Sequence, residues 1–128
     1  MSEFEEQVKS DMEINMYDLV DESRKLPNTI QTYTDYLHDS NKKLNKVKLK
    51  IDETVRGRFI YYMKDYDIKF NSSDARKMAE SDDNVIKLRK IEKELQSTTE
   101  YLKNILWNLR EKNKCISNAI QVKKMELG

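Results

Sequence analysis

The sequence predicts an all-α protein in which two long helices form an extended hairpin, with short helices at the N-terminus and in the connection. Charged residues make up 37% of the chain and hydrophobic residues 38%, whereas globular domains average about 25% and 45 to 50%. Only two glycines and one proline occur in 128 residues, so little interrupts regular structure. The last third of the chain repeats apolar residues every three and four positions, as a coiled coil does. The length indicates a single helical domain, residues 1–128.

Residues 1–14 are expected to form a mobile or partner-dependent acidic arm, because no apolar period there lasts for more than one turn. A short helix is then predicted from Asn15, which can act as its N-cap, to about Lys25. Leu26-Pro27 is expected to end that helix and to begin the next one. Proline is tolerated in a first turn, where its missing N–H is not needed.

A long basic helix is predicted within residues 28–70. Gly57 interrupts it at a cost of about 1 kcal/mol relative to alanine. Three explanations for a glycine here remain open: a close approach of the backbone to a ligand, a close approach to a neighbouring helix, or a mild kink. The apolar stripe of the helix follows helical spacing and consists of Ile30, Tyr33, Leu37, Leu44, Val47, Ile51, Val55, Phe59, Tyr62 and Tyr66.

The connection contains a short predicted helix that Ser72 or Ser73 can cap and that runs through about Ala79. The C-terminal helix is predicted over residues 84–127, with Ser81 or Asp82 as its cap. Its heptad seam has eleven members, eight of them apolar: Leu88, Ile91, Leu95, Thr98, Leu102, Ile105, Leu109, Lys112, Ile116, Ala119 and Lys123.

A helix of this length would extend roughly 60 Å, whereas a compact chain has a radius of gyration of only about 14 Å. It therefore needs an equally long partner helix or further copies of the chain. The stripe widens between Tyr101 and Leu109, as is typical of bundles with more than two helices. We expect a homo-oligomeric bundle, with a plain intramolecular hairpin as the alternative. The expected oligomerisation residues are Leu95, Leu102, Ile105, Leu106, Leu109, Ile116, Ala119 and Ile120.

Charge is distributed unevenly along the chain. Residues 1–40 hold ten acidic and three basic residues, a net charge of −7, while residues 41–70 hold nine basic and four acidic residues, a net charge of +5. The chain as a whole carries only +1. This polarity favours a polyanionic partner at the middle segment.

Basic and aromatic residues alternate in that segment. Lys42, Lys46 and Lys50 recur every four residues and so line one edge of the helix. Cations that neutralise phosphates and aromatic rings that stack bases are what hold single-stranded nucleic acid. A solvated lysine face with tyrosines in the core is the alternative. The predicted DNA-binding residues are Arg56, Arg58, Tyr61, Tyr62, Lys42, Lys43, Lys46, Lys48 and Lys50.

No catalytic activity is predicted, and no cofactor or metal is expected. His38 is the only histidine and Cys115 the only cysteine. No glycine-rich phosphate loop, metal-ligand cluster or nucleophile motif is present. No segment resembles a signal peptide, and no apolar run approaches the roughly 20 residues of a membrane span. We therefore expect an intracellular protein without membrane association.

The segment Val55-Arg56-Gly57-Arg58-Phe59-Ile60-Tyr61-Tyr62 resembles the signature of the UvsY recombination mediators of tailed phages, a basic-x-Arg sequence followed by a Tyr-Tyr pair. Further segments resemble the family in the same order, so that the resemblance covers about residues 11–128. They are Leu26-Pro27 before a long helix, the helix start Ser81-Asp82-Asp83, the stretch Ile116-Ser117-Asn118-Ala119-Ile120 and the terminal glycine.

This resemblance implies an all-helical, ring-like homo-oligomer held together largely through its C-terminal helices. It also implies binding of single-stranded DNA and loading of the phage's RecA-like recombinase onto DNA covered by the phage single-strand-binding protein, in the cytoplasm of the infected bacterial host. Arg56 and Arg58 become the first candidates for DNA contact. The second hypothesis is a structural coiled-coil adapter that does not bind nucleic acid. Salt-dependent binding of single-stranded DNA distinguishes the two.

Overall fold

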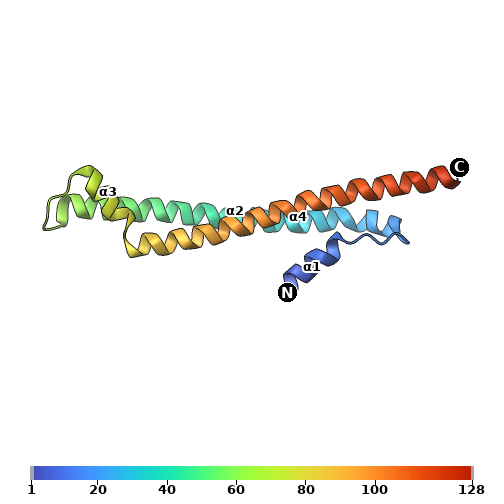
Figure 1. Cartoon of the computed structure of the whole chain (residues 1–128), viewed down its shortest axis with the longest axis horizontal. Coiled ribbons are helices and arrows are strands. Elements are labelled where there is room, and N and C mark those ends of the chain that lie inside the picture. The colour runs from blue at the N-terminus through green and yellow to red at the C-terminus, as the bar shows by residue number, and fades with distance from the viewer. Residues whose placement is uncertain (1, 128) are drawn as a thin grey trace. The chain divides into compact units, whose positions relative to one another are not determined.

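The computed structural model of the chain describes residues 2–127, and within them it contains helices and no strand. Met1, where the predicted arm begins, and Gly128, the terminal glycine of the resemblance, lie outside the described residues. The all-α prediction with two long helices is confirmed (Figure 1). The elements are the helices α1 (Glu3–Met12) and α2 (Leu19–Ile60), the π-helix η1 (Tyr61–Asp65), and the helices α3 (Ser72–Glu80) and α4 (Asp83–Leu127).

The chain divides into two compact units, and both long helices pass through each of them. The terminal unit comprises residues 1–38 and 100–128, and the hairpin unit comprises residues 39–99. In the hairpin unit Ser40 contacts Thr99 and Arg58 contacts Asp82, so α2 and α4 run antiparallel there.

The segment predicted to be a mobile or partner-dependent acidic arm contains a capped helix, α1. The Ser2 hydroxyl accepts a hydrogen bond from the Glu5 N–H at 3.2 Å, which satisfies one of the free donors at the helix start. Glu3, Glu5 and Glu6 lie in the first turn, where the helix dipole favours negative charge. The acidic residues therefore belong to a helix start.

Packing fixes α1 against the terminal unit. Phe4, Val8 and Met12 recur every four residues and share one face. Val8 is buried, and the Phe4 ring makes edge-to-face contacts with Tyr33 and Tyr101 at centroid distances of 6.2 and 6.1 Å. This apolar period lasts only two turns, too short to be recognised against the acidic background of the segment.

Helix α2 continues through Pro27, where the sequence predicted a break between two helices. Proline inside a helix costs about 3 kcal/mol. Leu19, Leu26 and Tyr33 are each at most 4% exposed, and burial of one large apolar side chain contributes about 1.5 to 3 kcal/mol. Packing on both sides of the proline therefore outweighs its local cost.

The predicted caps are partly corrected. Asp18, not Asn15, caps α2, since its carboxylate accepts a hydrogen bond from the Asp21 N–H at 3.1 Å. Asn71, not Ser72 or Ser73, caps α3 by accepting a hydrogen bond from the Asp74 N–H at 2.7 Å. The cap predicted for α4 is present, because the Asp82 carboxylate accepts a hydrogen bond from the Asn84 N–H at 3.0 Å.

The terminal unit has a large apolar core. Five of the predicted oligomerisation residues, Leu102, Ile105, Leu106, Leu109 and Ile116, are buried in it, and each is at most 4% exposed. α1 and α2 provide the cover that the sequence analysis assigned to other copies of the chain. The remaining core residues are Val8, Leu26 and Tyr33.

A partly buried polar network adjoins this core. The Lys112 ammonium donates to the Asp11 carbonyl oxygen at 2.6 Å and pairs with the Glu22 carboxylate at 3.0 Å. The Tyr33 hydroxyl donates to the Asp11 carboxylate at 2.7 Å. The pKa of Tyr33 is raised well above its usual value of about 10, mainly by burial of the hydroxyl and secondly by this hydrogen bond.

The hairpin unit buries Leu44 and Ile51 of α2 together with several small side chains. Ala75 and Ala79 of α3 and Val85 of α4 are fully buried, and the Thr99 hydroxyl donates to the Leu95 carbonyl at 2.8 Å while it contacts the Ser40 hydroxyl at 2.8 Å. The predicted seam is displaced by one residue here, since Thr99 is buried whereas Thr98 and Ile91 are exposed. Both registers share Leu95 and Leu102, so spacing alone does not distinguish them.

Within residues 2–127, no helix combines the length and the apolar character needed to cross a membrane.

Candidate nucleic-acid interface

An arginine surrounded by aromatic rings lies where α2 passes into η1. The Arg58 guanidinium carbon is 4.5 Å from the ring centroid of Tyr61 and 5.3 Å from that of Tyr62, which are distances typical of cation–π contacts. The Tyr61 and Tyr62 rings pack edge to face at 5.2 Å. Tyr66 packs edge to face against both, and it also stacks on Phe70 at 5.5 Å with an interplanar angle of 27°.

Arg58 also contacts Asp82, the residue that caps α4. Its Nε lies 2.9 Å from the Asp82 carboxylate, although the N–H is not directed at any described acceptor. Its Nη2 donates to the Tyr62 hydroxyl at 3.4 Å. The Tyr62 hydroxyl, together with the negative charge of Asp82, raises the pKa of Arg58. The guanidinium group therefore stays charged and joins the end of α2 to the start of α4.

The two arginines predicted to bind DNA, Arg56 and Arg58, differ in their contacts. Arg58 contacts Asp82 and the tyrosine rings, so it links the end of α2 to the start of α4 within the hairpin unit. Arg56 is exposed and forms no ion pair with any described residue. The sequence treated the two positions alike because neither lies on the main apolar stripe. The tyrosines that contact Arg58 follow it by three and four residues, whereas Asp82 is 24 residues away along the chain and meets Arg58 only in the folded structure.

The predicted lysines lie on the surface of α2. Lys42, Lys43, Lys46, Lys48 and Lys50 are all exposed, and none pairs with a carboxylate among residues 2–127. Helical spacing places Lys42, Lys46 and Lys50 along one edge and Lys48 on another. We call Lys42, Lys46 and Lys50 the lysine row. Its charges are available to a polyanion.

Gly57 faces open space. A Cβ atom added there would meet nothing within 4 Å, so no neighbouring helix approaches the backbone at this position. Of the explanations that the sequence left open, close packing against another helix is therefore wrong.

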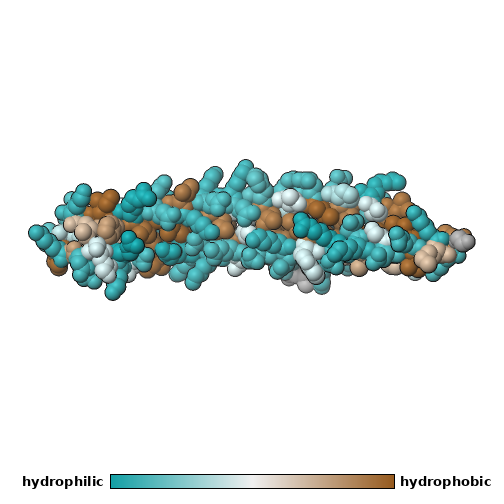
Figure 2. Space-filling view, turned by 90° about the horizontal axis from the view of Figure 1, so that it is seen from above, coloured by the Kyte–Doolittle hydropathy of each residue, from teal (hydrophilic) through white to brown (hydrophobic). Residues whose placement is uncertain are grey.

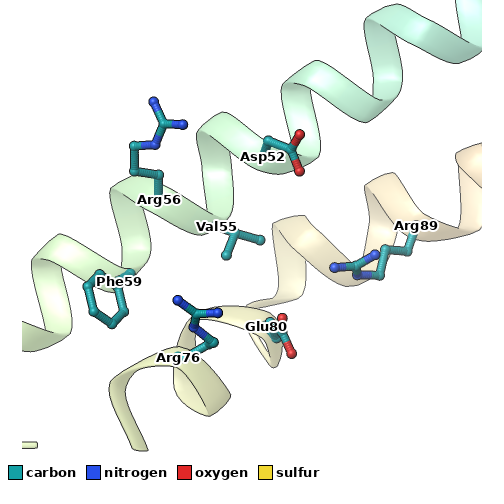
Figure 3. A pocket seen from close by; sticks show the side chains of 7 residues that line it. All are labelled: Asp52, Val55, Arg56, Phe59, Arg76, Glu80 and Arg89. Atoms are coloured by element: carbon teal, nitrogen blue, oxygen red, sulfur yellow. The ribbon is translucent and has the colours of Figure 1, made fainter. Parts of the chain in front are cut away.

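A cavity of about 330 Å³ lies in the hairpin unit, next to Arg56 (Figure 3). Two of its arginines, Arg76 of α3 and Arg89 of α4, were missed by the sequence analysis because they are far from the basic segment in the sequence. Only the hairpin brings them to the same cavity. Its lining residues are Asp52, Val55, Arg56, Phe59, Arg76, Glu80 and Arg89.

Apolar surface is exposed near the aromatic cluster. Met63 is 41% exposed and Ile68 is 62% exposed. Figure 2 shows brown, apolar surface at the η1–α3 end of the view, beside teal, charged side chains. Exposed apolar groups thus lie in η1 and in the segment that follows it, the same part of the chain as Tyr61, Tyr62, Tyr66 and Phe70.

Comparison with known proteins identifies the family. A family model described as the recombination, repair and single-stranded-DNA-binding protein UvsY matches residues 7–128. The chain belongs to the UvsY family. No curated protein matches its sequence.

Solved UvsY structures share the fold of this family member. Crystal structures of the bacteriophage T4 recombination mediator protein UvsY match with a TM-score of 0.82 at 13% identity, covering 98% of this chain and 99% of that one. For T4 UvsY in a second crystal lattice the TM-score is 0.83 at 15% identity, and the match covers 100% of this chain and 99% of the T4 chain. At this identity the structures establish the fold alone.

Proposed function

We propose that this UvsY-family protein is a recombination mediator that binds single-stranded DNA and helps to load a RecA-like phage recombinase onto DNA covered by single-strand-binding protein. One observation carries the DNA-binding part. Lys42, Lys46, Lys50 and Arg56 are exposed on α2 without an ion pair to any described residue. Membership in a family described as single-stranded-DNA-binding supports the same proposal.

The lysine row and Arg56 can bind a phosphate backbone without sequence preference. Each neutralised phosphate releases counterions and changes the slope of log affinity against log salt by about −0.7 on single strands. Long flexible lysines follow the backbone as point charges. Tyr61 and Tyr62 contribute mainly by holding Arg58. Their rings pack against one another, and the Arg58 guanidinium group lies over the Tyr61 ring.

We propose that the protein acts as a homo-oligomer, which would repeat this surface and increase avidity. The core of the terminal unit already buries most of the predicted interface residues. The exposed face of α4 remains available, where Trp107 is 61% exposed and Tyr101 is 40% exposed. Trp107→Ala should therefore lower the mass measured by light scattering while leaving helical content unchanged. An unchanged mass would remove Trp107 from the interface.

Fluorescence anisotropy with a labelled single-stranded oligonucleotide tests DNA binding between 50 and 200 mM salt. Replacing Lys42, Lys46 and Lys50 by alanine should weaken binding at least tenfold and make the salt slope shallower by about 2. The matched control replaces Lys103, Lys114 and Lys124 by alanine, which removes the same charge from α4 instead.

Three outcomes contradict the proposal in different ways. Equal losses in both triple variants would mean that overall charge matters and the lysine row does not. Wild-type protein that does not bind single-stranded DNA would favour the coiled-coil adapter. A protein that binds DNA but does not restore recombinase activity on DNA precoated with single-strand-binding protein would contradict the mediator role alone.

A further inference from the structure

The cavity in the hairpin unit combines cations with an apolar wall. In Figure 3, Arg76 extends from α3 toward the side of α2 that carries Val55 and Phe59, and Arg89 extends from α4 toward the same space. Arg56 also lines the cavity, and its guanidinium group points outward from α2. The volume, about 330 Å³, is near the lower limit for a small-molecule site, about 300 Å³.

The arginines of this cavity have no partners within the described chain. Neither Arg76 nor Arg89 forms an ion pair or a side-chain hydrogen bond with a described residue, and the same holds for Arg56. The single interhelical ion pair of the hairpin unit, among its described residues, uses Arg58 and Asp82. Each guanidinium group thus keeps five N–H donors in the planar arrangement that matches phosphate oxygens.

The charge of the lining fits one phosphodiester. Three arginines and the two carboxylates of Asp52 and Glu80 leave a net charge of +1, which one phosphodiester group neutralises. Phe59 is half-buried and supplies an aromatic ring, and single-stranded nucleic acid is commonly held by such rings together with cations. A phosphate donor set beside an aromatic ring is complementary to a nucleotide unit.

We propose that this cavity holds one nucleotide of a bound single strand, with Arg76 and Arg89 on its phosphate, Phe59 against its base and Arg56 at the rim. This inference rests on the proposed DNA binding and extends it from α2 to α3 and α4. Arg56 lines the cavity and lies on α2, the helix that also carries the lysine row. An acidic peptide segment would satisfy the arginines but not the aromatic ring.

The test uses the full chain and a 5′-fluorescein-labelled oligothymidine. Replacing both Arg76 and Arg89 by glutamine should weaken binding about tenfold at moderate salt and make the salt slope shallower by about 0.7, since both side chains neutralise the same phosphate. The matched control replaces Lys77 and Lys87 by glutamine, which removes the same charge from α3 and α4 outside the cavity and should change affinity less than twofold. The R76K/R89K variant keeps the charge but loses the planar donor set, so it should recover the salt slope but not the full affinity.

Two further variants test the base and the carboxylates. Phe59→Leu should weaken binding severalfold without changing the salt slope, because stacking is lost and no charge is removed. Glu80→Gln should strengthen binding, because it removes a negative charge from the cavity. Thermal unfolding of each variant shows whether a loss of affinity comes from a loss of folding.

The outcomes separate this inference from the proposed function. If wild-type protein binds oligothymidine and the lysine-row variant is weakened, while R76Q/R89Q binds like wild type at unchanged thermal stability, the cavity assignment is wrong and the proposed function stands. If R76Q/R89Q and K77Q/K87Q weaken binding equally, the effect is one of overall charge and the inference fails. If a polyglutamate peptide binds the cavity more tightly than oligothymidine does, as judged by competition, the occupant is an acidic protein segment and the inference fails.

Discussion

Both units contain a cavity of similar size, but the side chains that line the two cavities differ in charge. The cavity of the terminal unit, about 340 Å³, is lined by hydroxyls, aromatic rings and one carboxylate: Phe4, Gln7, Asp11, Thr29, Thr32, Tyr33 and Tyr36. The cavity of the hairpin unit, about 330 Å³, is lined by three arginines and two carboxylates. Helix α2 contributes to both cavities, together with α1 in the terminal unit and with α3 and α4 in the hairpin unit.

The two units also differ in the partners of their polar side chains. In the terminal unit Asp11, Tyr33, Lys112 and Glu22 bond to one another and hold α1 in place. In the hairpin unit one ion pair, Arg58 with Asp82, joins α2 to the start of α4, and the arginines that line the cavity form no ion pair with a described residue. Polar side chains of the terminal unit therefore bond to one another around α1, whereas three arginines of the hairpin unit form no ion pair with a described residue.

The largest expected effect concerns the two cores. Leu109 of the terminal unit and Val85 of the hairpin unit are both fully buried. Leu109→Ala should lower the free energy of unfolding by about 2 to 5 kcal/mol, and Val85→Ala by less, about 1.6 kcal/mol for two carbon atoms before any cavity penalty. Urea unfolding followed by circular dichroism measures both. A larger loss for Val85→Ala would contradict the view that the main core lies in the terminal unit.

The next effect concerns the two interhelical ion pairs. The side chains of Lys112 and Glu22 are 8% and 22% exposed, whereas that of Arg58 is 36% exposed. Lys112→Ala should cost about 2 kcal/mol, less than the 3 to 5 kcal/mol of fully buried pairs because Glu22 keeps some contact with solvent. Arg58→Ala should cost about 1 kcal/mol because water screens the pair. Arg56→Ala, the matched control, should leave stability unchanged. Equal costs for Arg56 and Arg58 would contradict a structural role for Arg58.

The smallest effect is a pH dependence within the terminal unit. The groups that face the Tyr33 hydroxyl are Asp11, Tyr36 and Tyr101, and the folded protein raises the pKa of Tyr33 above its unfolded value of about 10. Above pH 10 the unfolded chain therefore loses this proton while the folded chain keeps it. The contribution of Tyr33 to stability is present below pH 10 and falls as the pH rises, by about 1.4 kcal/mol per pH unit.

Tyr33→Phe isolates this contribution. The variant should be less stable than wild type by about 1 kcal/mol at pH 7, because the hydrogen bond to Asp11 is lost. The two proteins should become more alike in stability between pH 10 and 11, as measured by urea unfolding. Tyr17→Phe, at a residue that is 99% exposed, should show no such change. A gap between Tyr33→Phe and wild type that stays constant with pH would contradict the assignment.

The sequence by itself determined the helices and their amphipathic faces. Composition, the heptad spacing and the stripe from Ile30 to Tyr66 were sufficient to predict two long helices, because helical periodicity is a local property of the chain. Ser81 or Asp82 was predicted as the cap of α4 from the local preference for serine and aspartate at helix starts, and Asp82 accepts the capping hydrogen bond. α1 was missed because its apolar period is short. The unbroken α2 was missed because packing at Leu26 and Tyr33 outweighs the local preference of Pro27.

Only the tertiary structure decided which side chains are free to act. Arg56 and Arg58 are two residues apart and alike in sequence, yet Arg58 is engaged by Asp82 and Tyr62 while Arg56 is exposed. Arg76 and Arg89 reach the cavity beside Arg56 only because the hairpin folds α3 and α4 back toward α2. Local spacing specifies the face of a helix on which a residue lies. The partner that it meets there depends on contacts between residues far apart in the chain, and no local pattern encodes those contacts.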